Sequence, residues 1–264
     1  MKHILGEKTV GHMGTLDPMA EGVLVIGVGK SARLFDYLCG RKKTYIAKFE
    51  FGYETDTLDA DGTVVKKTDD IPSVDAVLGA MLSLVGESEQ VPPEYSAKHI
   101  GGKRAYDLAR KGERVDLTPS RITIYDVQLL SQPRLNETVF SITCSAGTYI
   151  RSICRDVAQM CGSLATLTYL KRSRSGCFDE KDAITFDKLF EQKENALIPP
   201  DKVIDLPRLI VPTELYDDLE HGRTIAYDGG DALVYGNGMF FGIGCSVGGV
   251  LKIKTYLREQ REDK

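Results

Sequence analysis

The sequence predicts an α+β fold, in which strands and helices are mixed without a regular strand–helix–strand repeat. Residues 44–51 alternate between apolar and polar side chains, which indicates a strand. In residues 74–85 and 150–161 the apolar side chains recur every three or four positions, which indicates amphipathic helices. Because these patterns follow one another irregularly, an α+β class is favoured over a parallel α/β class.

The elements of the larger, N-terminal part can be placed from these patterns and from glycines that end helices. Within the strand at 44–51 the apolar residues alternate with polar ones, apart from Ile46. The expected elements are, in order, a helix at 31–39 ended by Gly40, a strand at 44–51, a strand near 64–65 after a turn at 59–62, a helix at 74–85 ended by Gly86, a strand at 140–144, and a helix at 150–161 ended by Gly162.

The composition changes after Pro199 and Pro200, and this change predicts a second domain. One short helical stretch is expected at 214–219. Asn237 and Gly238 form a strong two-residue hairpin signal between strand-like runs. The expected strands are 232–235, 239–244 and 250–256. We therefore expect a larger domain over 1–203, a small β-rich domain over 207–258 and a solvated tail over 259–264.

Composition narrows the class of protein. The chain has 264 residues, of which 42% are hydrophobic, and no apolar run approaches the length of a membrane span. The N-terminus has no secretory apolar core, and the six cysteines include no C-x-x-C pair, so we expect a cytoplasmic protein with free thiols. A net charge of -4 argues against coating nucleic acid by charge alone, although a local basic surface stays compatible with it.

The segments that resemble metal-binding or nucleotide-binding motifs each lack a required residue. The Gly29-Lys30-Ser31 run lacks the earlier glycine of a phosphate-binding loop, because Leu24 stands there. A calcium loop around Asp59 would need a glutamate at the twelfth position, where Thr68 stands. The four histidines are scattered. We therefore expect no metal and no cofactor, and we interpret the acidic cluster as turns or partners of basic residues: Glu54, Asp56, Asp59 and Asp61.

Asp17 is the first candidate catalytic residue. The segment 11–18 reads GHMGTLDP, which places this carboxylate after two glycines and before Pro18. Glycine permits close backbone approaches, and proline keeps the residue before it out of the helical region. The carboxylate therefore lies on a stiff bent loop. An Asp before a proline is also a common helix start, in which its oxygen caps free N–H groups, and the segment alone leaves both interpretations open.

Arg151 is the second candidate. It falls in the first turn of the expected helix at 150–161, where a cation opposes the helix dipole by some tenths of a kcal/mol. A charge-assisted pair with a carboxylate contributes about 1.5–3 kcal/mol and outweighs that penalty. Asp17 is a candidate partner. The alternative is an arginine that reaches solvent.

A basic segment suggests contact with RNA. Residues 98–114 hold six basic side chains against two acidic ones, with tyrosines nearby at 95 and 106. Cations for phosphates and aromatic rings for bases are typical of an RNA-binding loop and helix. A solvated helix face is the alternative. The candidate RNA-binding residues are Lys98, Lys103, Arg104 and Arg110.

These motifs together resemble the bacterial tRNA pseudouridine synthase B family, which modifies a uridine in the T arm of tRNA. The resemblance runs over nearly the whole chain. It is carried by the segment 11–24 and by five further blocks in the family's order: Lys43-Thr44-Tyr45, Gly52 to Gly62, Pro92 to Ala97, Gly147 to Arg151, and Leu170-Lys171-Arg172.

The resemblance implies a fold and roles for single residues. The fold would be a mixed, mainly antiparallel sheet with flanking helices, an RNA-gripping insertion at about 88–115, and a PUA-like RNA-binding domain at the C-terminus. Asp17 would be catalytic and paired with Arg151. Tyr45 would stack on the target uracil, and the other substrate-binding residues would be His12, Tyr149 and Leu170. The enzyme would act on the T-arm stem-loop as a monomer, without an obligate protein partner.

The N-terminus departs from the family pattern. Members normally begin further upstream with an additional strand, whereas Met1 here falls within the helix expected before the catalytic loop. A missing strand would expose a sheet edge and loosen the loop that carries Asp17. The second hypothesis is therefore a non-catalytic tRNA-binding or chaperone protein. An unrelated Asp-dependent phosphotransferase is a remote alternative. Guide-RNA-dependent relatives are a nearer one, although the sequence does not indicate their partner proteins or longer chains.

Overall fold

The computed structural model describes residues 1–37, 42–96, 99–100, 103–104 and 117–257. The chain forms two compact units, each built from separated stretches of sequence. The first unit contains Met1–Thr15, Leu24–Gly40 and Asp182–Lys264, and the second contains Leu16–Val23 and Arg41–Lys181. We describe each unit by itself.

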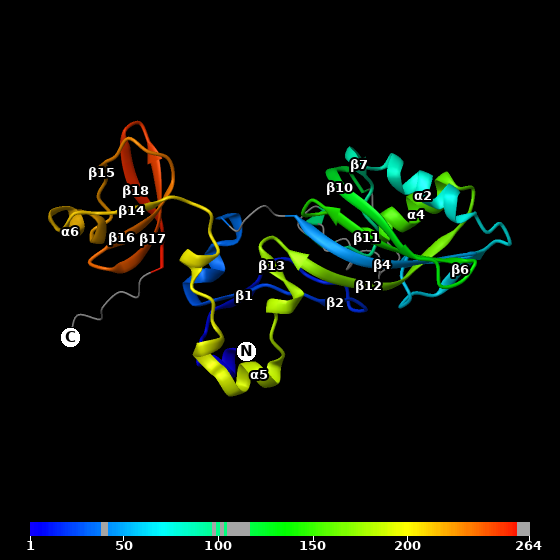
Figure 1. Cartoon of the computed structure of the whole chain (residues 1–264), viewed down its shortest axis with the longest axis horizontal. Coiled ribbons are helices and arrows are strands. Elements are labelled where there is room, and N and C mark those ends of the chain that lie inside the picture. The colour runs from blue at the N-terminus through cyan, green and yellow to red at the C-terminus, as the bar shows by residue number, and fades with distance from the viewer. Residues whose placement is uncertain (38–41, 97–98, 101–102, 105–116, 258–264) are drawn as a thin grey trace. The chain divides into compact units, whose positions relative to one another are not determined.

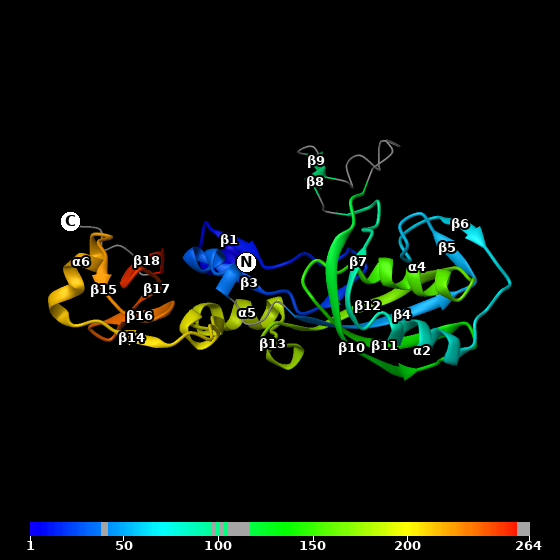
Figure 2. The ribbon, with the colours of Figure 1, turned by 90° about the horizontal axis from the view of Figure 1, so that it is seen from above.

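The second unit is built on a seven-stranded sheet, shown from two directions in Figures 1 and 2. Its strands pair antiparallel, except that β2 lies parallel to β12. In spatial order they are β13 (Phe178–Asp179), β12 (Ala165–Ser175), β4 (Lys43–Phe51), β11 (Glu137–Cys144), β10 (Ser120–Ser131) and β7 (Gly86–Gln90), with β2 (Glu21–Gly22) beside β12.

Strand β4 lies within the sheet between β12 and β11, and one of its faces is apolar from Tyr45 to Phe51. Tyr45, Ala47, Phe49 and Phe51 are buried and alternate with partly exposed residues, as the sequence predicts. The same face is covered by α2 (Val74–Ser83) and α4 (Ile150–Met160), whose apolar residues enter the same core. The sheet and these helices therefore hold the core of this unit.

Two small hairpins extend the second unit. Strands β5 (Tyr53–Thr55) and β6 (Val64–Lys67) pair antiparallel and enclose the segment 56–63. Strands β8 (His99–Ile100) and β9 (Lys103–Arg104) form the other pair. The first hairpin matters for the site, because the segment it encloses reaches β12 through a bridge between Asp59 and Leu167.

The first unit contains a five-stranded sheet with its own apolar core. Asn237 and Gly238 both have positive φ and join two strands by the tight turn that the sequence predicts. The helix α6 (Tyr216–Glu220) packs into the same core through Leu219. In spatial order the strands are β14 (Arg208–Ile210), β16 (Ala232–Gly236), β17 (Met239–Val247), β18 (Val250–Tyr256) and β15 (Ile225–Ala226).

The rest of the first unit is made of short elements. They are α1 (Lys2–Leu5), β1 (Val10–His12), which pairs with β3 (Ile26–Val28), and α5 (Phe186–Gln192). The helix expected at 31–39 is wrong as an α-helix: the described part forms 3-10 turns at Gly29–Arg33 and Phe35–Tyr37. Among residues 31–37 only Leu34 is buried, so this part of the chain packs no amphipathic face that would stabilise an α-helix.

The expected fold class is confirmed: helices and a mainly antiparallel sheet are mixed, and a β domain lies at the C-terminus. The long strands β10 and β12 were not expected from the sequence. The predicted boundary between 203 and 207 stays a prediction. Within the described residues, the structure holds no helix long and apolar enough to cross a membrane.

Candidate active site

The segment that carries Asp17 is fastened to the edge of the large sheet. The Val23 amide donates to the carbonyl of Arg172 at 2.8 Å, and the buried Arg172 side chain donates through Nε to the Val23 carbonyl at 2.7 Å. Gly22 has a φ of 101°, and a side chain there would overlap with the Arg172 carbonyl. The Ala20 amide also donates to the Asp17 carbonyl at 2.9 Å. These bonds hold the loop close against β12.

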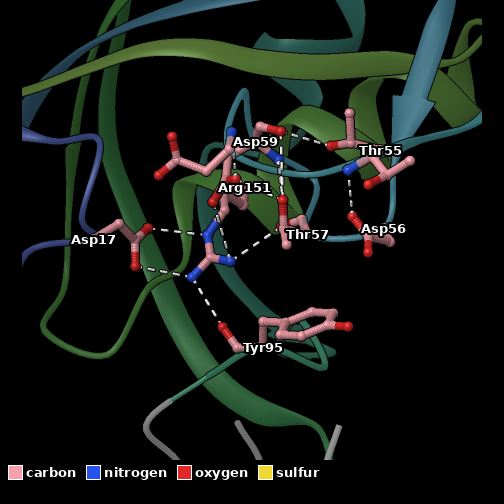
Figure 3. Close-up of polar contacts among 9 residues, drawn as sticks. Asp17, Thr55, Asp56, Thr57, Asp59, Tyr95 and Arg151 are labelled. Atoms are coloured by element: carbon pink, nitrogen blue, oxygen red, sulfur yellow. Dashed lines mark hydrogen bonds and ion pairs between the residues drawn. The ribbon is translucent and has the colours of Figure 1, made fainter. Parts of the chain in front are cut away.

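The Arg151 guanidinium is the centre of the site (Figure 3). Its Nε and Nη2 donate to the two carboxylate oxygens of Asp17 at 2.9 and 2.8 Å. Nη1 donates to the Thr57 carbonyl at 3.0 Å and lies 3.4 Å from the Asp59 carboxylate, and Nη2 also donates to the Tyr95 carbonyl at 3.0 Å. Arg151 therefore donates four hydrogen bonds through its guanidinium and also forms an ion pair with Asp59.

Burial distinguishes the two carboxylates that flank Arg151. The side chains of Arg151 and Asp59 are each 5% exposed, whereas that of Asp17 is 29% exposed. Burial raises the pKa of Asp59 above its usual value, although the hydrogen bond from Thr57 and the charge of Arg151 oppose that rise. The geometry thus leaves Asp17 as the carboxylate that an incoming molecule can reach, with Asp59 and Arg151 behind it.

The loop between β5 and β6 is shaped to place Asp59. Thr57 Oγ1 donates to the Asp59 carboxylate at 2.5 Å, and the Asp61 amide donates to the same oxygen at 3.2 Å. Leu58 has a positive φ of 64°, an unusual conformation for a branched residue. Its amide and carbonyl are both hydrogen bonded, to Thr55 and Leu167. The strain is therefore held by fixed partners, as is common at functional sites.

Tyr45 and Leu170 lie on the core face of adjacent strands. Tyr45 in β4 stands opposite Arg172 in β12, and Leu170 stands opposite Ala47, so these side chains share one face. Burial raises the pKa of Tyr45 to about 12, and the nearby charge of Asp17 adds to the rise, while the charge and hydrogen bond of Arg172 lower it. The phenol therefore stays neutral at physiological pH.

Tyr149 immediately precedes α4, two residues before Arg151. Its backbone amide donates to Gln90 Oε1 at 2.8 Å, and its carbonyl accepts from Gln90 Nε2 at 3.1 Å. This pairing ties the start of the helix to the end of β7.

The structure brings together the expected pair of Asp17 and Arg151, with both oxygens of the carboxylate engaged. His12 lies in β1 of the first unit with an exposed side chain. Lys103 and Arg104 lie in β9, where only the strand is described. Lys98 and Arg110 fall outside the described residues. The roles expected for all these residues stay predictions.

Sequence reasoning missed three contributors to the site, namely Thr57, Asp59 and the Tyr95 carbonyl. The sequence predicts only that Asp59 forms a turn or pairs with nearby basic residues. It does both, since it accepts from the Asp61 amide and pairs with Arg151. Because its sequence context is typical of a turn, the sequence does not indicate that Asp59 pairs with Arg151, which is distant along the chain. Backbone carbonyls leave no sequence signal at all.

No group of three or more His, Cys, Asp or Glu side chains that could hold a metal occurs in the parts of the chain that are described. The chemistry that the arrangement supports is that of one accessible carboxylate held by a buried cation. Such a carboxylate can act as a nucleophile or can stabilise positive charge on a sugar.

Comparison with known families gives matches over most of the chain. A model described as "TruB family pseudouridylate synthase (N terminal domain)" matches residues 2–150, and one described as "tRNA pseudouridylate synthase B C-terminal domain" matches residues 151–216. Many curated relatives are named tRNA pseudouridine synthase B, and two of them are the following. The one from Syntrophomonas wolfei is 39% identical over 237 residues, covering 87% of this chain and 79% of the relative. The one from Gluconacetobacter diazotrophicus is 36% identical over 233 residues, covering 86% and 76%.

Solved structures share the fold. A chain from an archaeal box H/ACA sRNP Nop10–Cbf5 complex matches with a TM-score of 0.68 at 20% identity, covering 98% of this chain and 80% of that chain. A chain from a Cbf5–Nop10–Gar1 complex matches with a TM-score of 0.65 at 23% identity, covering 93% and 72%. At such identities the likeness concerns the fold alone.

Proposed function

The chain belongs to the TruB family of pseudouridylate synthases, and we propose that it converts a uridine in the T arm of tRNA to pseudouridine with Asp17 as the catalytic residue. The observation that carries this proposal is the Asp17 carboxylate, which is accessible and is held at both oxygens by the buried Arg151. The proposed reaction is that of the family, and the geometry of the site supports Asp17 as the residue that carries it out.

The reaction is an isomerisation, so its atoms balance without a co-reactant. The bond between N1 and C1′ breaks, the uracil turns, and C5 forms a new bond to C1′. The proton on C5 passes to solvent, and N1 takes up a proton. Asp17 has three possible roles: attack on C1′, attack on C6, or stabilisation of an oxocarbenium-like sugar. Each needs an ionised carboxylate, and Arg151 donates a hydrogen bond to each of its two oxygens.

Aromatic and apolar side chains suit a nucleobase that has left its helix. Extruding a base costs a few kcal/mol. Stacking on an aromatic ring returns about 1–3 kcal/mol per base. Tyr45 offers a neutral phenol for stacking, and Leu170 and Tyr149 would add apolar and aromatic contact. We assign His12 the task of holding the extruded nucleotide.

Binding of the tRNA would rest on sites away from the reacting uridine. We assign phosphate contacts to Lys98, Lys103, Arg104 and Arg110 in the insertion, and further RNA contacts to the β domain of 207–258. Since phosphate contacts release counterions, tRNA affinity should fall steeply as salt rises. Removing one contact should weaken all tRNA substrates alike and reduce the salt slope by about one unit.

The experiment that tests this function is tritium release from C5-labelled uridine. A T-arm stem-loop is expected to release tritium, whereas an anticodon stem-loop of the same length is not. Asp17→Asn keeps the size of the side chain but removes its charge, and should lower the rate at least about 10³-fold. The matched control is Asp126→Asn, an exposed aspartate of β10, which should leave the rate unchanged.

Two results would overturn the proposal. Near-normal tritium release by Asp17→Asn would show that another group does the chemistry. Salt-sensitive tRNA binding by the wild type without any product would favour the second hypothesis, a non-catalytic tRNA-binding or chaperone protein.

A further inference from the structure

The side chain of Gln90 makes a contact to which none of the roles proposed above assigns a function. Gln90 ends β7, its side chain is directed at the start of α4, and the residue is only 3% exposed. Its amide pairs with both the N–H and the carbonyl of Tyr149, at 2.8 and 3.1 Å. Two opposed hydrogen bonds to one residue fix both its position and its orientation.

The start of α4 needs such an outside partner. Tyr149 is the residue that precedes the helix, and among the described residues its own side chain makes no capping hydrogen bond. The first turn carries Arg151, a cation that the helix dipole disfavours at that end. Gln90 therefore holds the backbone from which the Arg151 side chain projects.

The segment that follows Gln90 contacts the guanidinium end of the Arg151 side chain. The Tyr95 carbonyl accepts a hydrogen bond from Arg151 Nη2 at 3.0 Å. Between these two points the Val91 carbonyl accepts from Ser152 Oγ at 2.8 Å. The segment thus fixes the Arg151 backbone through Gln90 and the Arg151 guanidinium through Tyr95.

We propose that Gln90 is a positioning residue, which sets the geometry between Arg151 and Asp17 by fixing Tyr149. The inference rests on the proposed function, because it concerns the efficiency of the same site. Gln90 touches neither carboxylate and acts through the backbone. A small displacement of Arg151 would misplace Asp17, and a misplacement of about 1 Å can cost about 10²-fold in rate.

The side-chain amide is the chemical requirement. It accepts one hydrogen bond and donates the other, which matches the N–H and carbonyl of one residue. Methionine has similar length but makes neither bond. A glutamate can accept from the Tyr149 amide, but it donates to the Tyr149 carbonyl only when it is protonated.

The experiment compares Gln90→Met, Gln90→Glu and Ser152→Ala with the wild type. It measures the single-turnover rate of pseudouridine formation and the Kd for a T-arm stem-loop. Gln90→Met should lower the rate about 10²-fold and leave Kd within about twofold. Ser152→Ala is the matched control: it removes a bond between the same segment and the same helix, and should keep the rate within about threefold.

Gln90→Glu supplies a readout that a merely structural role would not move. Its rate relative to the wild type should rise as the pH falls from about 8 to about 5, because the protonated carboxyl regains the donor. Gln90→Met should show no such recovery. If Gln90→Met does not fold, this pH profile decides the question.

Several outcomes would overturn the inference. They are a Gln90→Met rate within threefold of the wild type, a loss confined to Kd, an equal loss in Ser152→Ala, and a flat relative pH profile for Gln90→Glu. The wild-type assay separates the two proposals. Absence of product from the wild type overturns the proposed function, whereas results obtained with an active wild type concern Gln90 alone.

Discussion

At the scale of single residues, Arg151 is tolerated in the interior because it is surrounded by acceptors. An unpaired buried cation is very costly, and removing one partner of a buried ion pair typically costs about 3–5 kcal/mol. Here two carboxylates and two backbone carbonyls surround the guanidinium. The same contacts hold Asp17 in one orientation, so the role proposed for Asp17 depends on the same side chain as the stability of the buried site.

The substitution Arg151→Lys should therefore lower both the stability of the protein and the rate of the reaction. An ammonium is a point charge that cannot pair with both oxygens of Asp17 and also reach Thr57 and Tyr95. We expect about 2–4 kcal/mol less stability in urea unfolding and a rate at least about 10²-fold lower. Arg155→Lys, on the same helix but paired with Asp156, is the control and should change either quantity little. An Arg151→Lys enzyme with wild-type rate would contradict the assigned geometry.

The raised pKa of Tyr45, about 12 against an ordinary 10.0, has a consequence for alkaline stability. Because the folded state holds this proton more tightly than the unfolded state, the stabilisation is complete below pH 10 and is lost as the pH rises through 12. A shift of this size corresponds to up to about 3 kcal/mol.

Tyr45→Phe has no hydroxyl to ionise, so it should lose less stability than the wild type over this pH range. Urea unfolding at a series of alkaline pH values measures the difference. Parallel pH dependences of the two proteins would show that Tyr45 does not hold its proton in this way.

At the scale of elements, β12 organises the site. It pairs with β4 on one side and with β2 on the other, so it fixes Tyr45, Leu170 and the end of the Asp17 segment together. Its register shifts twice against β4, between Leu167 and Tyr169 and between Arg172 and Arg174. These irregularities let the strand change which side chains it directs toward the core.

The same irregularities explain what the sequence could predict. Strand β4 is regular, so its alternation revealed both its position and its buried face. The bulges of β12 break the period of two, because Leu170 follows Tyr169 directly and ends the alternation of the preceding residues. A strand of this kind has no simple sequence signature, although it borders the site.

The contacts of the candidate site likewise differ in whether the sequence could predict them. The pair of Asp17 and Arg151 could be foreseen, because a cation in a first helical turn calls for an anion. The contact of Asp59 with Arg151 could not, since turn chemistry explained that residue locally. Gln90 was equally hidden, because a glutamine that binds backbone groups looks like any other polar residue.

Gly22→Ala tests the attachment of the Asp17 segment to β12. The residue has a positive φ, and an added Cβ would overlap with the Arg172 carbonyl. The loop must shift, so we expect a rate at least about 10²-fold lower and a stability loss of about 1–3 kcal/mol. Single-turnover assays and urea unfolding measure the two effects.

Gly79→Ala is the matched control. This glycine lies within α2, where a Cβ meets nothing within 4 Å. The change should add about 0.5–1 kcal/mol of stability and leave the rate unaltered. If Gly22→Ala behaved like Gly79→Ala, the close contact at β12 would not control the loop.

At the scale of the whole molecule, the two units have separate cores. The sheet of the second unit shares its core with α2 and α4, whereas the C-terminal sheet is filled by another set that includes Leu219, Val234 and Phe241. All the described contacts of Arg151 belong to the second unit. A defect in the C-terminal core should therefore leave the chemical step intact.

Phe241→Ala tests this separation. Phe241 is 1% exposed and packs edge-on against Tyr216, with 4.7 Å between the two ring centroids. We expect about 3–5 kcal/mol less stability in β16–β18, seen as lost protection in hydrogen exchange, with a near-normal rate on a minimal T-arm stem-loop. Met239→Ala, an exposed change in the same strand, should do little. Equal loss of protection in β4 and α4 would mean that the cores unfold as one.

The contact between Asp17 and Arg151 spans 134 residues of chain, and this has a consequence during synthesis. At about 5–20 residues per second, roughly 7–27 s separate the emergence of the two partners from the ribosome. Through that interval the nascent chain carries a carboxylate without its counter-ion and without the helix that orients it. The pair that we propose for catalysis is thus completed only once Arg151 has been synthesised, and until then the emerging chain meets RNA without it.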